Sequence, residues 1–181
     1  EVDALILNLQ SQISDLKGEV VDNEGNVYSS VQLGDQLWTT INAENTTYRD
    51  GTAIPQVTDL NTWPNLTTGA WCYIDNDPSK GKLYNWFAVA GIHDNDPNTP
   101  NKEFAPQGWF VPDQNQFYVL RQYLIEIGFN FDGSSSNVAQ NTLGKAMSSS
   151  SGWTIFAGGS SDRVGVNQTL NNSTGFNITP D

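Results

Sequence analysis

Lys82-Leu83-Tyr84-Asn85-Trp86 stands near the middle of the chain, and Ala105-Pro106-Gln107-Gly108-Trp109-Phe110-Val111-Pro112 follows further along. Both stretches are rich in aromatic residues. The stretches that precede them are Asp22-Asn23-Glu24-Gly25-Asn26-Val27-Tyr28, Leu33-Gly34-Asp35-Gln36-Leu37-Trp38, Ala43-Glu44-Asn45 and Tyr48-Arg49-Asp50-Gly51-Thr52-Ala53-Ile54-Pro55. Together these motifs form one ordered series over residues 22–112, so they are interpreted as the signature of one domain.

This ordered series resembles the Fibrobacter succinogenes major paralogous domain, which occurs in secreted and surface proteins of Bacteroidetes-type bacteria and their phages. The resemblance implies an α+β, C-type-lectin-like module with short antiparallel strands, long loops and one clear helix. It also implies a binding unit outside a cell or on a virion, and not an enzyme. Phe110 stands where the family usually has His, and family members continue into an aromatic-rich segment beyond Asp181. We therefore expect the end of the module to be missing or replaced.

The composition narrows the set of partners. The chain has 181 residues, with 8 basic and 20 acidic side chains and a net charge of −12. Such a charge repels phosphate backbones and anionic lipids, so no nucleic acid is expected as a partner. No apolar run approaches the roughly 18 residues of a membrane span, so no membrane insertion is expected. The start at Glu1 predicts a fragment or a processed form.

The N-terminal residues carry a heptad pattern that predicts a short coiled-coil stalk over residues 1–21, followed by the domain at 22–181. The seam residues are Val2, Ile6, Leu9, Ile13, Leu16 and Val20. The alternative is an amphipathic helix that folds back on its own domain. β-Branched residues at a with Leu at d favour a dimer. Leu5 and Leu7 widen the apolar face, and comparable surface shafts are commonly trimeric, so we favour a homotrimer.

Short strands with turn residues between them are expected after Gly25. Alternating apolar and polar residues predict a hairpin from residues 26–28 and 30–33 that leads into 36–38. Residues 45–69 are expected to be irregular, and residues 70–74 to form a strand. Cys72, the single cysteine, excludes an intrachain disulfide and is predicted to be a buried small hydrophobe.

One clear helix is predicted after Pro112. Asp113 is a good N-cap, and Gly128 supplies the stop. The residues predicted to face the core are Phe117, Leu120, Leu124 and Ile127. Residues 83–90 fit either a short helix or a buried strand, and residues 153–156 and 175–178 are predicted strands.

Catalytic motifs are not evident. His93, the single histidine, lies in a polar loop without a nucleophile motif beside it. One cysteine does not fit the two-cysteine mechanism of the lectin-like formylglycine-generating oxidases, and no pair of carboxylates is singled out for glycoside hydrolysis. The sequence therefore predicts a protein that is not an enzyme and has no catalytic cofactor.

A calcium site is a better possibility than a catalytic site. Asp94, Asp96 and Asn98 alternate in the way that calcium loops begin. Thr99 and Ala105 stand where an EF-hand needs Gly and Glu. The alternative is an ordinary turn rich in Asp and Asn.

Aromatic residues in the loops are the predicted recognition surface, because a flat ring stacks on a sugar or anchors a protein partner. The candidate ligand-binding residues are Tyr48, Trp63 and Trp153, with Asn61, Asn65 and Asp75 as polar partners. Other aromatic residues lie in the family-defining motifs and are predicted to be scaffold; they are Trp38, Tyr84, Trp86 and Trp109.

These features predict an extracellular fibre, spike or adhesin on a virion or bacterial surface. Its coiled-coil stalk would present several lectin-like heads that attach to a cell-surface glycan or protein through avidity. A structural decoration or filament subunit that binds no small ligand is one alternative. A secreted carbohydrate-active accessory domain is another.

Overall fold

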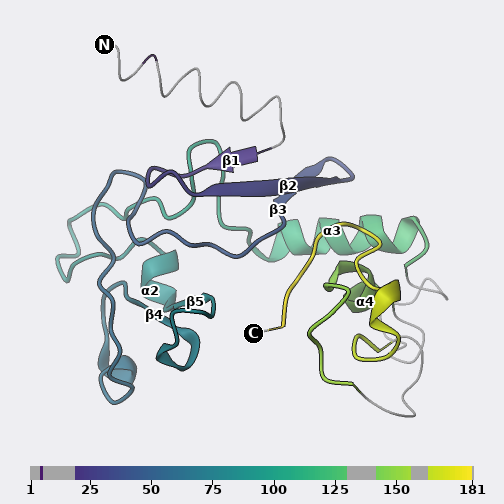
Figure 1. The fold of residues 1–181 in the computed structure, drawn as a ribbon. Coiled ribbons are helices and arrows are strands. Elements are labelled where there is room, and N and C mark those ends of the chain that lie inside the picture. The colour runs from purple at the N-terminus through teal and green to yellow at the C-terminus, as the bar shows by residue number, and fades with distance from the viewer. Residues whose placement is uncertain (1–4, 6–18, 130–141, 156–162, 181) are drawn as a thin grey trace. The chain divides into compact units, whose positions relative to one another are not determined.

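The computed structural model describes residues 5, 19–129, 142–155 and 163–180. In chain order the strands and helices are β1 (Glu19–Val21), β2 (Val27–Leu33), β3 (Gln36–Thr39), β4 (Trp71–Tyr73), β5 (Lys82–Tyr84), α2 (Trp86–Val89), α3 (Gln114–Glu126) and α4 (Leu143–Met147). Single 3-10 turns form η1 (Trp63–Asn65), η2 (Ile74–Asn76) and η3 (Gln168–Leu170). Short antiparallel strands with one long helix make this a mixed α+β fold, as expected (Figure 1). None of the described helices is long and apolar enough to cross a membrane.

The described residues divide into two compact units. The first unit contains Tyr28 with the residues before it and Asn42–Val111. The second unit contains Ser29–Ile41 and Pro112–Pro180. Each unit has a hydrophobic cluster of its own.

The N-terminal seam prediction is wrong for its last member. Val20 lies in β1, the edge strand of a sheet with the order β1-β2-β3, and its side chain is only 3% exposed. A β-branched residue in a strand packs well against its neighbours, so Val20 belongs to the core and not to a helical seam. The other five seam residues, from Val2 to Leu16, lie outside the described residues.

The predicted hairpin between residues 26–28 and 30–33 is wrong, because Val27–Leu33 is one strand, β2. β2 instead pairs antiparallel with β3, which contains the predicted segment 36–38, and Leu33 lies opposite Gln36. Gly34 has a φ of +63° in the turn between them, a conformation that glycine adopts without steric cost. The strand before the turn is longer than predicted, because Val27–Leu33 runs without a break.

The second unit is built on α3. Asp113 accepts from the backbone N–H groups of Asn115 and Gln116, and Gln116 Oε1 accepts in return from the N–H of Asp113. This capping box confirms the predicted start of the helix. Leu120 and Leu124, four residues apart on one face, are buried against Leu33 and Leu143.

The prediction that four residues of this helix face the core is wrong for two of them. Phe117 is 52% exposed and Ile127 is 49% exposed. Phe117 lies at the edge of the buried face, where its ring contacts Trp38 with centroids 5.2 Å apart. Ile127 is the C-cap residue, past the last turn that packs.

The two strands predicted near the C-terminus are also wrong for the described residues. Trp153 has no strand partner, because Gln168 satisfies its backbone: Oε1 accepts from the Trp153 N–H at 3.0 Å, and Nε2 donates to the Trp153 carbonyl at 2.8 Å. Ile178 forms one isolated parallel bridge with Ser148. At Trp153, side-chain hydrogen bonds replace strand pairing.

The first unit centres on Tyr48, Ile54, Trp71 and Ala88, with the antiparallel pair β4 and β5 beside them. The predicted strand at 70–74 is confirmed as β4, and Cys72 is buried in it, where burial raises the pKa of its thiol. Residues 45–69 are irregular, as predicted, apart from η1 and isolated bridges.

Arg49 explains why two of the sequence motifs occur together. Its Nε donates to the carbonyl of Ala105 at 2.8 Å, and its Nη2 donates to those of Pro106 at 3.0 Å and Trp109 at 2.9 Å. A planar guanidinium suits several acceptors with fixed directions. The Tyr-Arg-Asp-Gly motif therefore holds the Ala-Pro-Gln-Gly-Trp motif in place within the first unit.

Candidate functional site

Residues 92–101 form a polar loop in the first unit, which we call the 92–101 loop. Gly91 and Lys102 close the loop at its base, where the Lys102 N–H donates to the Gly91 carbonyl at 2.8 Å. Gly91 has a φ of +77°, and a Cβ on it would lie 1.9 Å from the Lys102 oxygen. Only glycine fits this position. The Gly69 N–H also donates to the Ile92 carbonyl, and this hydrogen bond joins the loop to the segment just before β4.

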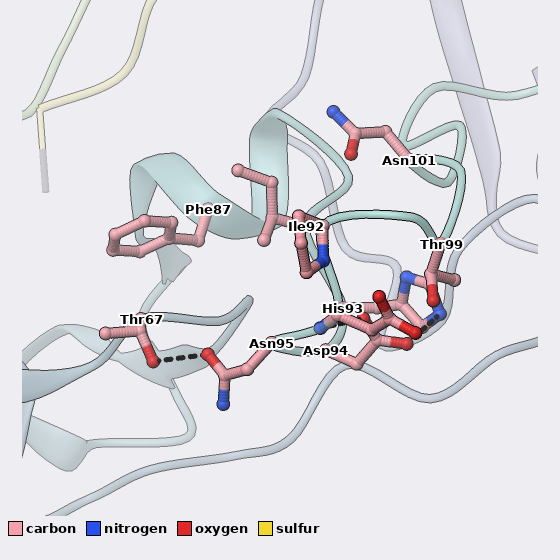
Figure 2. A pocket seen from close by; sticks show the side chains of 10 residues that line it. Thr67, Phe87, Ile92, His93, Asp94, Asn95, Thr99 and Asn101 are labelled. Carbon is pink, nitrogen blue, oxygen red and sulfur yellow. Dashed lines mark hydrogen bonds and ion pairs between the residues drawn. The ribbon is translucent and has the colours of Figure 1, made fainter.

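A cavity of about 290 Å³ opens along this loop (Figure 2). Its lining residues are Thr67, Phe87, Ile92, His93, Asp94, Asn95, Asp96, Pro97, Thr99 and Asn101. Apolar side chains supply part of the wall, and amide, hydroxyl and carboxylate groups supply the rest. A cavity of this size lies just below the range for small-ligand sites, which is about 300–1,000 Å³.

Some polar groups of the cavity are already engaged by the protein. The Thr67 hydroxyl donates to Asn95 Oδ1 at 2.7 Å, which fixes the orientation of that amide (Figure 2). Asn101 is exposed, and its side-chain amide has no hydrogen-bond partner within residues 19–129 or the other described segments. An amide without an internal partner can both donate to and accept from a ligand.

The predicted metal ligands form successive turns in the loop. Asp94 Oδ1 accepts from the N–H of Asp96 at 3.0 Å, and Asp96 Oδ1 accepts from the N–H of Asn98 at 2.9 Å. Asp94 and Asp96 line the cavity, whereas Asn98 does not. Calcium needs six to eight oxygens, so carbonyl groups or water would have to complete such a site. Over the described part of the chain no group of three or more His, Cys, Asp and Glu side chains could hold a metal, and calcium stays a prediction.

His93 contributes a base to the cavity. Its Nε2 lies 3.3 Å from Asp94 Oδ2, and its ring meets the Tyr48 ring edge-on at 6.3 Å. An imidazole that activates a nucleophile must hydrogen-bond to a hydroxyl or thiol. In the segments that the structure describes, His93 has no such hydrogen bond.

Trp86 was assigned to the scaffold by its motif, and the structure corrects this. The side chain is 68% exposed, and its ring lies edge-on to Phe87 with centroids 5.4 Å apart. The reason is the shortness of α2. Asn85 caps this helix by accepting from the Ala88 N–H at 2.9 Å, and the four-residue helix buries Ala88 alone. Trp86 therefore extends the aromatic surface next to the cavity-lining Phe87.

Tyr48 is the clearest correction among the predicted ligand-binding residues. Its side chain is 0% exposed and packs in the core of the first unit, so its ring is not a stacking surface. The Tyr48 hydroxyl is buried without a hydrogen-bond partner among the described residues. The loop position suggested exposure, but the surrounding chain folds over the ring.

The other predicted ligand-binding residues are not among the residues that line the cavity. Trp63, Asn61 and Asn65 share the loop that contains η1, where the Trp63 indole donates to the Val57 carbonyl at 2.8 Å. Asp75 is exposed and forms an ion pair with Lys80. These four belong to the first unit, and Trp153 belongs to the second.

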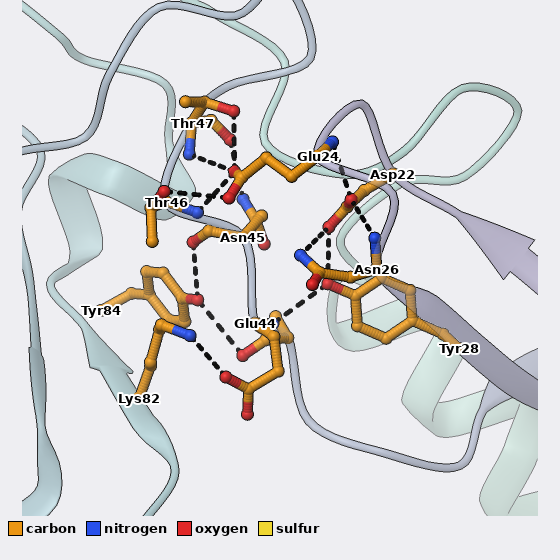
Figure 3. Close-up of polar contacts among 11 residues, drawn as sticks. Asp22, Glu24, Asn26, Tyr28, Glu44, Asn45, Thr46, Thr47, Lys82 and Tyr84 are labelled. Carbon is orange, nitrogen blue, oxygen red and sulfur yellow. Dashed lines mark hydrogen bonds and ion pairs between the residues drawn. The ribbon is translucent and has the colours of Figure 1, made fainter. Parts of the chain in front are cut away.

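A second polar cluster lies in the first unit, and we call it the Glu24 network (Figure 3). Hydrogen bonds and an ion pair within the protein join its members, which are Asp22, Glu24, Tyr28, Glu44, Asn45, Thr46, Thr47, Lys82 and Tyr84. Glu24 Oε1 accepts from the backbone N–H groups of Thr46 at 2.6 Å and Thr47 at 2.7 Å, and both threonine hydroxyls also donate to this carboxylate. The Tyr28 hydroxyl donates to Asp22 Oδ2 at 2.7 Å.

Lys82 joins the Glu24 network from β5. Its ammonium lies 2.5 Å from Glu44 Oε2, and 5.5 Å and 5.6 Å from the ring centres of Trp71 and Tyr73. The Tyr84 hydroxyl donates to the carbonyl of Asn45 at 2.8 Å. These contacts confirm Tyr84 as scaffold.

The sequence identified only some of the residues that line the cavity. Asp94 and Asp96 were identified as candidates, whereas Phe87, Ile92 and Asn101 were missed. The pairing of a glycine that needs positive φ with a following polar loop would have indicated a fixed loop base. No local pattern indicates that Thr67 reaches the same cavity.

Comparison with known proteins gives one result. No curated protein and no solved structure matches the chain at a significant level. The profile of the Fibrobacter succinogenes major domain matches residues 31–181, which is more than half of the chain. The predicted family is thereby confirmed. The chain belongs to the Fibrobacter succinogenes major domain family.

Proposed function

We propose that this protein is an extracellular glycan-binding module with a C-type-lectin-like fold, and that the cavity along the 92–101 loop is its binding site. The observation that supports this most is the lining of the cavity. Phe87 and Ile92 offer apolar surface to the C–H face of a sugar ring, and Asn101 offers a free amide to its hydroxyls. Trp86 adds an exposed ring beside Phe87.

A single cavity of this size gives a weak site, which fits the proposed mode of attachment. We infer that several copies of the domain act together on one stalk as a fibre, spike or adhesin of a virion or bacterial surface. Linked weak sites raise the overall affinity by about 10²–10⁴ when their spacing matches the target. The heptad pattern from Val2 to Leu16 supports an oligomer.

The site is tested by Asn101→Ala against Asn61→Ala. Both residues are exposed amides, but Asn101 lines the cavity and Asn61 lies in the loop that the sequence singled out. The full chain is screened on a glycan array, and the best soluble glycan is titrated by calorimetry. Asn101→Ala should weaken binding about 2- to 10-fold, the worth of one hydrogen bond, and Asn61→Ala should leave it unchanged. Weakening by Asn61→Ala alone would move the site to the η1 loop.

The oligomer is tested separately on the full chain. Ile6→Asn and Ile13→Asn place polar groups in the predicted seam, and light scattering measures the mass of each variant and of the unchanged chain. A trimer that becomes a monomer supports the stalk. A monomer in every case contradicts it.

A further inference from the structure

Asp96 presents an unused carboxylate oxygen in the cavity. Its Oδ1 accepts from both the backbone N–H and the side-chain amide of Asn98, each at 2.9 Å. Its Oδ2 has no hydrogen bond or ion pair with any residue that the structure describes. Asp94 differs, because its Oδ1 accepts from the Asp96 N–H and its Oδ2 faces His93 Nε2 at 3.3 Å. Asp96 is therefore the acid that a ligand can reach.

The charge of the cavity follows from its lining residues. Asp94 and Asp96 are the acids, His93 is the base, and no Lys or Arg lines this cavity. The two hydrogen bonds from Asn98 hold the pKa of Asp96 below its ordinary value, so this carboxylate is ionised at neutral pH. A ligand carboxylate or sulfate placed here would meet a like charge, and no Lys or Arg in the lining would offset it.

We infer that the cavity selects saccharides with a free amine, such as glucosamine oligomers, and rejects those with carboxylate or sulfate groups. This inference rests on the proposed glycan-binding function and names its ligand class. A sugar ammonium carries three donors, one of which pairs with Asp96 Oδ2. N-acetylation removes the positive charge and leaves a single N–H donor, so the ion pair with Asp96 is lost.

The experiment compares three soluble oligomers of equal length with the full chain: glucosamine, N-acetylglucosamine and galacturonate. Affinities are measured by calorimetry in a chelator, so that no divalent cation competes for the carboxylate. The glucosamine oligomer should bind most tightly and the galacturonate oligomer least. Asp96→Asn, which keeps the side-chain shape, should reduce the preference for glucosamine over N-acetylglucosamine about two- to fivefold, the worth of an exposed ion pair.

Asp77→Asn is the matched control. Asp77 Oδ1 also accepts from the backbone two residues on, at Ser79, and its pKa is lowered by the hydrogen bonds from Ser79, but it lies outside the cavity lining. Both variants change the net charge by the same amount. Equal loss of preference in both would overturn the inference, because it would trace the effect to the overall charge of −12.

Two further outcomes separate this inference from the proposed function. In the first outcome, the glucosamine and N-acetylglucosamine oligomers bind with equal affinity, and Asn101→Ala still weakens the binding of both. This outcome overturns the amine preference and leaves the proposal of glycan binding intact. Binding of none of the three oligomers, together with no glycan on the array, overturns both.

Discussion

The Glu24 network and the 92–101 loop contain the same kinds of residue, yet they use them differently. In the network, the Glu24 carboxylate accepts four hydrogen bonds from Thr46 and Thr47, residues distant from it along the chain. In the loop, Asp94 and Asp96 accept from backbone groups two residues ahead. Long-range partners stabilise the fold, whereas local turns leave part of each carboxylate facing the cavity.

This contrast shows why acidic residues alone do not locate a site. Glu44 pairs with Lys82, whose ammonium also lies over Trp71 and Tyr73. Among the residues that the structure describes, Asp96 has no comparable cation. What separates a binding candidate from a structural acid is therefore the set of partners, and partners come from the tertiary fold.

Gly91→Ala should break the loop with the largest effect. The added Cβ would meet the Lys102 carbonyl at 1.9 Å, and the φ of +77° would strain any other residue. We expect a loss of roughly 3 kcal/mol in the free energy of unfolding, from overpacking and left-handed strain together. Urea denaturation measures it, and Gly25→Ala is the control, since its φ is +85° with nothing within 4 Å of the Cβ. Equal losses in the two variants would mean that strain alone acts.

Glu24→Gln should weaken the network without touching the cavity. The amide keeps one acceptor oxygen but loses the charge and places an NH₂ against the donors of Thr46 and Thr47. We expect a loss of about 2 kcal/mol in unfolding free energy, since hydrogen bonds to charged groups contribute about 1.5–3 kcal/mol each and this group is partly solvated. Thermal unfolding measures it. Glycan affinity of the folded variant should stay unchanged, and a parallel loss of affinity would contradict the separation of the two regions.

Elements with strong local signals were predictable from the sequence. Asp113 and the spacing of Leu120 and Leu124 identified α3, and Gly34 identified the β2–β3 turn. The family motifs were predictable as a set, but their reason lies in long-range contacts such as Arg49 to Trp109. Such contacts join residues distant in sequence, and no periodicity shows them.

The exposure of single aromatic residues was the least predictable feature. Tyr48 and Trp86 exchanged their expected places: the loop residue is buried and the motif residue is exposed. Exposure depends on which segments pack over a ring, and α2 is too short to cover Trp86. The seam residue Val20 was misassigned for a related reason, since a β-branched residue fits a strand edge as well as a helix.

High pH should destabilise the fold through the buried tyrosines of the network. Burial raises the pKa of both Tyr28 and Tyr84 above the ordinary value of 10.0. Because the folded pKa is raised, the stability from these neutral phenols is fully present below about pH 10 and is lost as the pH rises further. Absorbance at 295 nm should show a cooperative step coincident with the loss of circular dichroism. Tyr28→Phe should move that step, whereas titration of every tyrosine near pH 10 with an intact spectrum would contradict the burial.

Asp96→Asn should have the smallest effect on stability, because Asp96 belongs to the 92–101 loop, where we propose that it contacts a ligand, and not to the Glu24 network that stabilises the fold. The side chain is exposed, and the asparagine oxygen can still accept from Asn98. We expect a change within about 0.5 kcal/mol in unfolding free energy, as for surface substitutions in general. The same pair of proteins tests the calcium prediction: if calcium binds at Asp94 and Asp96, millimolar calcium raises the melting temperature of the unchanged chain and not of the variant. A loss near that of Glu24→Gln without any ligand would place Asp96 among the structural acids instead.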